Sequence, residues 1–143
     1  MLIIFVILSK NKNMEATYLC PHCRAAINDD NHIILSAESG KEKKGLIFLT
    51  HEIGDYSASH SATLNIVKGE VADLYCPVCH ECLNTPQAEN LASYIRIEKD
   101  LKESRIVISR KYGEKITFKI ADDKKVESFG ESISRFVDPE WYL

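Results

Sequence analysis

The sequence predicts an all-β protein, and three observations indicate that class. Short runs rich in β-branched and aromatic residues recur along the 143-residue chain, separated by turns that contain glycine or charged residues. Several runs place their apolar residues on one face, as a half-buried strand does. No strand–helix–strand pattern follows the first cysteine pair. The composition, 45% hydrophobic and 27% charged, fits a soluble globular protein of one domain or two small ones.

The first element is the apolar stretch "MLIIFVILSKNKN", residues 1–13. It has no preceding basic residue and no small-residue cleavage site, so it makes a poor secretory signal. It is also shorter than the roughly 20 apolar residues that span a bilayer. We interpret it as an upstream extension of the reading frame or a disordered tail, ahead of a compact domain that begins at Met14. The alternatives are an edge strand over residues 2–8 and a membrane anchor.

The next element occurs twice, as "YLCPHCRAAI" (residues 18–27) and "LYCPVCHECL" (residues 74–83). Aligning the two copies pairs each cysteine of the first with one of the second, which selects four candidate metal ligands: Cys20, Cys23, Cys76 and Cys79. Cys82 falls on Ala26, so we expect a small buried side chain there; a substitute ligand and a reactive thiol are the alternatives. The alignment places His22 on Val78 and His80 on Arg24. It therefore predicts no histidine ligand.

These C-P-x-C pairs resemble the zinc knuckle of zinc-ribbon and rubredoxin-like domains. The resemblance implies a turn between two strands that directs two thiolates and several backbone N–H groups at one ion. Two such knuckles would hold one zinc per chain in a tetrahedral four-sulfur site. Here 52 residues separate Cys23 from Cys76, against about 15–20 in compact zinc sites. We therefore expect a split zinc ribbon, in which an insertion leaves one knuckle and returns to the other.

Three other uses of the cysteines stay open. Structural disulfides would suit an oxidising compartment, but five is an odd number of cysteines. "CPHC" also resembles the active site of thioredoxin-like oxidoreductases, which place it at the start of a long helix. An iron-bearing rubredoxin would normally have glycine after the second cysteine of each pair, where this chain has Arg24 and His80.

The insertion is expected to form hairpins, with strands over residues 32–38, 45–53, 61–67 and 70–75. Between the two pairs lies a polar loop over residues 51–61. It contains four residues with functional side chains: His51, Asp55, Tyr56 and His60. With no second motif nearby, we interpret it as an ordinary surface loop; a loop that acts over the metal site is the alternative.

An antiparallel β-meander is expected after residue 90, with strands over residues 92–98, 105–111, 115–121 and 125–129. Matching apolar faces predicts four cross-strand pairings. They are Ile106 opposite Ile120, Ile108 opposite Phe118, Ile97 opposite Ile106, and Ile95 opposite Ile108. The third of these also sets Glu98 against Arg105.

The same register gathers four basic residues on one outer face, with Lys111 opposite Lys115: Arg105, Lys111, Lys115 and Lys119. We interpret this face as a solvated, aggregation-resistant edge; a surface for a small anion or an acidic partner is the alternative. At the end of the chain, "DPEW" predicts a short helix that starts at Asp138 and Pro139. Its aromatic neighbours are expected to pack across the meander or to meet another subunit.

The distribution of charge along the chain limits the classes of function. The net charge is −3, and residues 14–90 hold five Lys/Arg against eleven Asp/Glu, whereas residues 91–143 hold eleven against ten. A cysteine-bearing half this acidic disfavours nucleic-acid binding. We expect a zinc-ribbon domain over 14–84 and a meander over 91–143, in a small cytoplasmic protein without a membrane span.

Four thiolates leave zinc no open coordination position, so no catalytic residues are expected. The predicted function is a structural zinc site in a module that binds another protein or regulates one. The alternatives are a thiol–disulfide or redox-sensing protein and a zinc-ribbon nucleic-acid binder.

Overall fold

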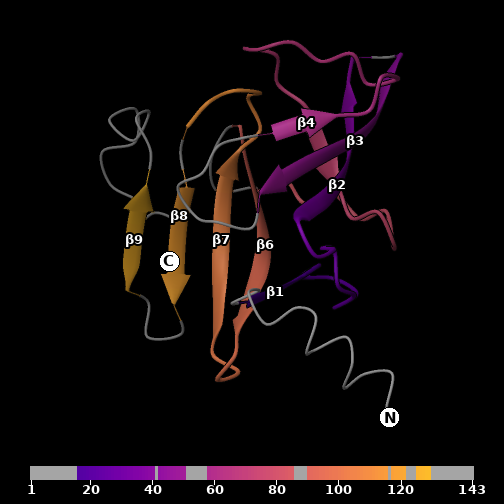
Figure 1. Cartoon of the computed structure of the whole chain (residues 1–143). Coiled ribbons are helices and arrows are strands. Elements are labelled where there is room, and N and C mark those ends of the chain that lie inside the picture. The colour runs from indigo at the N-terminus through magenta and orange to yellow at the C-terminus, as the bar shows by residue number, and fades with distance from the viewer. Residues whose placement is uncertain are drawn as a thin grey trace.

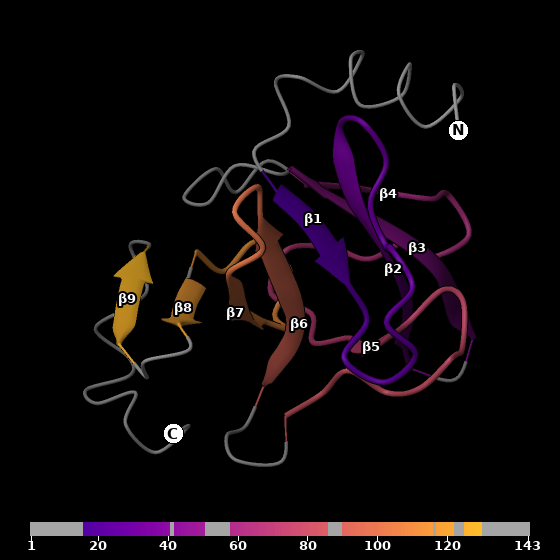
Figure 2. The same ribbon diagram turned by 90° about the horizontal axis from the view of Figure 1, so that it is seen from below.

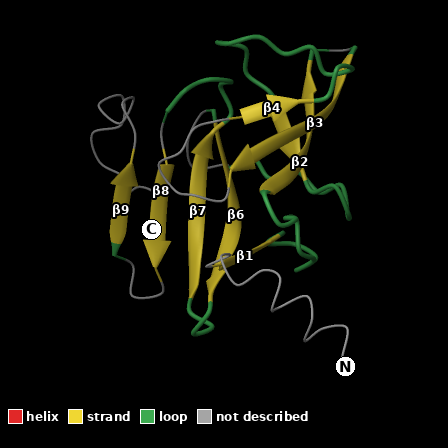
Figure 3. Cartoon of the chain, in the orientation of Figure 1, coloured by secondary structure: helices red, strands yellow, loops and turns green. Residues whose placement is uncertain are grey.

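A computed structural model describes residues 16–40, 42–50, 58–85, 90–115, 117–121 and 125–129. Over these residues the chain forms nine strands in two antiparallel sheets and no helix, so the all-β prediction is confirmed (Figures 1 and 3). Within the same residues, no helix is long and apolar enough to cross a membrane.

The larger sheet has five strands in the order β1-β6-β7-β8-β9. Its strands are β1 (Ala16–Leu19), β6 (Leu91–Glu98), β7 (Glu103–Ser109), β8 (Thr117–Ala121) and β9 (Val126–Phe129). The last four strands are the antiparallel meander that the sequence predicts. The remaining strand, β1, comes from the N-terminal part of the chain and pairs with β6.

The smaller sheet has four strands in the order β4-β3-β2-β5. Its strands are β2 (His32–Ser39), β3 (Lys43–Thr50), β4 (Ala58–His60) and β5 (Asp73–Tyr75). The hairpin β2–β3 matches the prediction. The strand expected over residues 61–67 is absent; Leu64 and Ile66 from that segment are buried without joining a ladder.

One face of β1, β6 and β7 packs against the smaller sheet, which lies beside it (Figure 2). Tyr18, Tyr94 and Ile106 from the larger sheet share this core with Leu35 and Leu74 from the smaller one. A second, smaller apolar cluster includes residues from the opposite face of the meander: Leu91, Val107, Phe118 and Ile120.

The predicted strand registers are wrong, and burial on two faces explains why. Ile106 lies opposite Lys119 and Tyr94, and Val107 lies opposite Phe118. Because Ile106 is 1% exposed and Val107 0%, both faces of β7 are buried. Matching apolar residues on one face therefore did not define the pairing.

The new register also redistributes the basic residues. Arg105 lies opposite Ile95 rather than Glu98. Lys119 is on the other face of the sheet, where its Nζ is 3.2 Å from Glu98 Oε1. Lys111 forms an isolated bridge with Val71 instead of facing Lys115. The predicted four-residue basic face is thus not formed.

Several predictions fall outside the described residues. These are the character of residues 1–13, three residues of the polar loop (His51, Asp55 and Tyr56), and the short C-terminal helix with its aromatic neighbours. His60 is described; it packs edge-on against Tyr112 with ring centroids 5.6 Å apart.

Candidate metal centre

The first knuckle is a tight turn that follows β1. The N–H of Arg24 donates to the carbonyl of Cys20 (2.9 Å), and the N–H of Cys20 donates to the carbonyl of Ala25 (3.0 Å). The N–H groups of His22 and Cys23 point at Cys20 Sγ, at 3.3 and 3.5 Å. Pro21 has a fixed φ that suits the first position of such a turn.

The second knuckle repeats these hydrogen bonds after β5. His80 N–H donates to Cys76 O (3.0 Å), and Cys76 N–H donates to Glu81 O (3.0 Å). The N–H groups of Val78 and Cys79 lie 3.3 and 3.4 Å from Cys76 Sγ. The repeated phrase in the sequence is therefore a repeated structure.

The structural repeat extends one residue past the phrase, to a pair of asparagines that sequence analysis missed. Asn28 Oδ1 accepts a hydrogen bond from Tyr18 N–H at 3.0 Å, and Asn84 Oδ1 accepts one from Leu74 N–H at 3.1 Å. Each side chain thus ties the strand that enters a knuckle to the segment that leaves it. Their signal was present, since both asparagines stand eight positions after the first cysteine of their knuckle.

The two knuckles bring four sulfur atoms together. Cys20, Cys23, Cys76 and Cys79 have all their Sγ atoms within 4.8 Å of one another. Across the knuckles, Cys20 Sγ lies 3.8 Å from Cys79 Sγ, and Cys23 Sγ lies 3.8 Å from Cys76 Sγ. A tetrahedron with metal–sulfur distances of about 2.3 Å has edges of about 3.8 Å. The cluster therefore has the dimensions of a four-thiolate metal site.

Electrostatics also favours a cation at this place. Burial raises the pKa of the Cys20 thiol to about 12. At Cys76 burial acts in the same direction, but the N–H groups of Cys79 and Val78 and two thiol hydrogen bonds outweigh it, so that pKa is lowered. Four thiolates this close would repel one another without a positive ion between them. All five cysteines of the chain are free of disulfides.

Cys82 lies outside the cluster, and its predicted burial is wrong. The residue is exposed, because it bridges to Tyr75 in the segment after the turn and its neighbour Leu83 is the one that faces the core, at 3% exposed. The carbonyl of Cys82 lies 3.1 Å from His22 Nε2. His22 thus links the two knuckles and is not part of the sulfur cluster.

The chain enters each knuckle from one sheet and leaves it toward the other (Figure 2). Before the first knuckle, Tyr18 of β1 pairs with Arg96 of the larger sheet; after it, Ile27 O accepts a hydrogen bond from Ile34 N–H of the smaller sheet at 2.7 Å. The second knuckle runs the opposite way. Leu74 of β5 pairs with the smaller sheet, and Leu83 O accepts from Ser93 N–H of the larger one at 3.0 Å.

The hairpins that follow the knuckles match as well. Ala37 pairs with Gly45 in β2–β3, and Arg96 pairs with Ser104 in β6–β7, so both partners shift by 59 positions. The strands that enter the knuckles pair with equivalent positions of these hairpins, since Tyr18 pairs with Arg96 and Leu74, 56 positions after Tyr18, pairs with Ala37. The chain therefore contains two copies of a strand–knuckle–hairpin unit that exchange their first strands, and the four sulfur atoms lie where the copies meet.

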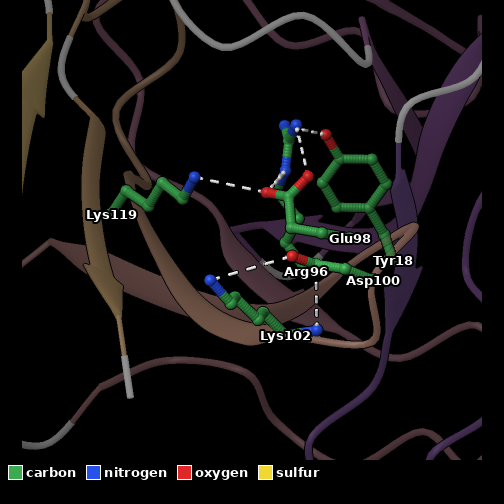
Figure 4. A network of polar contacts seen from close by, with 6 residues as sticks. All are labelled: Tyr18, Arg96, Glu98, Asp100, Lys102 and Lys119. Carbon is green, nitrogen blue, oxygen red and sulfur yellow. Dashed lines mark hydrogen bonds and ion pairs between the residues drawn. The ribbon is translucent and has the colours of Figure 1, made fainter. Parts of the chain in front are cut away.

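The two copies differ where their exchanged strands are attached. In one copy Leu74 lies opposite Ala37. In the other, Arg96 Nη1 donates to Tyr18 Oη at 2.9 Å and Arg96 Nε donates to Glu98 Oε1 at 2.7 Å. Figure 4 shows this network, in which Lys119 reaches the same carboxylate. A polar network centred on the buried Arg96 thus anchors the strand that leads to Cys20.

The residue after each second cysteine has a left-handed backbone, with φ of 63° at Arg24 and 64° at His80. These are the positions where rubredoxin-like knuckles normally have glycine. A side chain in this conformation costs about 1–2 kcal/mol, whereas glycine adds about 0.4–1 kcal/mol of unfolded-state entropy. We therefore expect His80→Gly to raise the free energy of unfolding of the metal-loaded protein by about 0.5–1 kcal/mol, measured by denaturant titration.

His22→Gly is the matched control, because His22 occupies the turn without a positive φ and contacts Cys82 O. It should lower the free energy of unfolding. An equal loss in both variants would show that the strain at position 80 is not significant.

No family model, curated protein or solved structure matches this chain.

Proposed function

We propose that the protein binds one zinc ion through the four clustered thiolates and that the ion is structural. The observation that carries the proposal is the sulfur cluster itself, with cross-knuckle Sγ–Sγ distances of 3.8 Å. The four N–H groups that point at Cys20 Sγ and Cys76 Sγ would disperse the negative charge of the bound thiolates.

A structural role follows from the position of the cluster and from its ligand number. A four-thiolate zinc has no open coordination site for water or substrate, so it supports no hydrolysis. What the ion would supply is a cross-link between two copies that otherwise hold together through exchanged strands and a shared core.

With a closed metal site, the fold would act through its surface, and we propose a protein partner. Val78 supports this choice, because it is 59% exposed at the turn of the second knuckle. A metal ion would hold this aliphatic side chain in a fixed position, which lowers the entropy cost of binding. The five free thiols fit a reducing compartment such as the cytoplasm.

The metal content of the protein tests the proposal. Protein purified without added metal should contain about one zinc per chain by elemental analysis, because four thiolates in a tetrahedral arrangement match zinc. A red, iron-containing protein would instead indicate an electron carrier. A folded protein without any metal would contradict the proposal.

Alkylation of the same preparation separates a scaffold from a redox enzyme. With zinc bound, only Cys82 should react rapidly, since it is exposed and outside the cluster. Zinc-bound thiolates should react slowly, and insulin-reductase activity should be absent. Because Cys23 is also exposed, its labelling is informative: rapid reaction of Cys23 in the zinc-bound protein would favour redox chemistry.

A further inference from the structure

A second candidate site lies away from the cysteines, at the end of β7 that adjoins β4 (Figure 1). An open pocket of about 290 Å³ is present there. It forms where the turn at Lys68 and Gly69 meets the connection between β7 and β8. Its lining includes three lysines and one carboxylate: Lys68, Lys111, Lys115 and Glu114.

The walls of the pocket are fixed by main-chain hydrogen bonds. Gly69 N–H donates to Tyr112 O at 2.8 Å, and Tyr112 N–H donates to Glu70 O at 2.8 Å. Val71 and Lys111 continue this pairing as an antiparallel bridge. The two segments that carry the lysines are therefore joined independently of any side-chain contact between them.

The charge of the lining is positive in a chain of net charge −3. Lys68 and Lys111 form no ion pair with any residue in the described part of the chain, whereas Lys43 and Lys119 each pair with a glutamate. The one carboxylate of the lining, Glu114, accepts a hydrogen bond from Ser109 Oγ at 2.6 Å. The positive charge of the pocket therefore rests on Lys68 and Lys111.

Gly113 allows Lys68 to approach the other two lysines. Its φ is +85°, and a Cβ atom at this position would lie 2.7 Å from Lys68 Cγ. The Lys68 stem therefore packs directly against the glycine backbone. Any larger residue at position 113 would both strain the turn and displace Lys68.

We propose that this pocket binds a small phosphate-bearing anion. Lysine ammonium groups are common phosphate ligands that act as point charges, and the pocket is at the small end of the range for ligand sites. It suits one or two phosphate groups rather than the backbone of a nucleic acid, whose binding surface is far larger. This site uses no cysteine, so it holds or fails independently of the zinc proposal.

Titration of the full-length, metal-loaded protein with inorganic pyrophosphate tests the site. We expect saturable changes in the backbone amide resonances of Gly69, Tyr112 and Gly113 at low ionic strength. Raising the salt to about 0.15 M should weaken binding, because exposed charges are screened over about 8 Å under those conditions. Shifts of the same size at lysines across the whole surface would overturn the proposal.

Charge-removing variants give the specificity test. Lys68→Gln and Lys111→Gln should each weaken pyrophosphate binding about fivefold, as expected for loss of one exposed ionic contact. Gly113→Ala should weaken it through displacement of Lys68. The matched control is Lys44→Gln, which removes the same charge from an exposed lysine paired with Glu38 and should leave the affinity unchanged.

Three results would overturn the assignment. The first is no saturable binding, and the second is an effect of Lys44→Gln as large as that of Lys68→Gln. The third is tighter binding of an oligoglutamate peptide than of pyrophosphate, which would identify an acidic peptide as the ligand.

Discussion

Cys76→Ser is expected to abolish metal retention and to unfold the protein. Binding of zinc to four deprotonated side chains contributes roughly 10–16 kcal/mol of apparent free energy in zinc-finger peptides, and the total stability of a small protein is about 5–15 kcal/mol. Cys76 is fully buried and accepts two N–H hydrogen bonds at Sγ. A serine hydroxyl at this position would be a poorer ligand for the ion and a poorer acceptor for these two N–H groups.

The measurements are zinc content and the far-ultraviolet circular dichroism of the variant, and Cys82→Ala is the matched control. Cys82 is exposed and outside the cluster, so Cys82→Ala should retain one zinc and the β-sheet signal. Chelation of zinc from the unmodified protein should reproduce the effect of Cys76→Ser. Loss of zinc in Cys82→Ala together with retention in Cys79→Ala would contradict the assigned quartet.

The cysteine quartet and the strands could be predicted because their signals are local. A C-P-x-C phrase specifies a turn within four residues, and the second copy of the phrase identifies which cysteines correspond. Strands β2, β3 and β6 to β9 follow runs whose composition favours extended backbone. These features depend little on what the rest of the chain does.

The exchange of first strands was not predictable, because it depends on contacts between distant segments. Tyr18 and Leu74 occupy equivalent positions, yet one faces Arg96 and the other Ala37. The two hairpins share a register but little sequence. Only the knuckles, where the geometry restricts the choice of residue, still show that the unit occurs twice.

The basic pocket was predicted only in part, because two of its three lysines, Lys111 and Lys115, belong to the candidate anion surface of the sequence analysis. The sequence grouped Lys111 and Lys115 with Arg105 and Lys119, which lie near them along the chain. In the structure Lys119 pairs with Glu98 and does not line the pocket. Its third lysine is Lys68, more than 40 positions before Lys111. The main-chain hydrogen bonds that join these segments, from Gly69 N–H to Tyr112 O and from Tyr112 N–H to Glu70 O, have no sequence signal.

Arg96→Met is expected to lower the free energy of unfolding by about 3 kcal/mol, measured by denaturant titration of the metal-loaded protein. Removing one member of a buried charged pair typically costs about 3–5 kcal/mol, since the partner is left buried and unpaired. The Arg96 side chain is 11% exposed, and that of Glu98 is 24% exposed. The expected value lies at the low end of the range because Lys119 still contacts Glu98.

Arg105→Met is the matched control for this variant. Arg105 is exposed, and among the residues that the structure describes its side chain makes one hydrogen bond, to Ser93 Oγ at 3.3 Å. Its loss should change the free energy of unfolding by less than about 0.5 kcal/mol, as for most surface substitutions. A loss in Arg96→Met no larger than in Arg105→Met would show that water replaces the lost contacts.

A double variant distinguishes the cost of losing Arg96 itself from the cost of leaving its hydrogen-bond partner Tyr18 unpaired. Tyr18→Phe removes the hydroxyl that accepts the Arg96 hydrogen bond, so combining it with Arg96→Met should cost less than the sum of the two single variants, by about 1 kcal/mol. The other copy of the unit supports this expectation, because it attaches its exchanged strand through apolar residues, Leu74 opposite Ala37. Strict additivity would contradict it. We therefore expect β1, the strand that leads to Cys20, to depend on matched side chains at positions 18 and 96 more than on a charge at position 96.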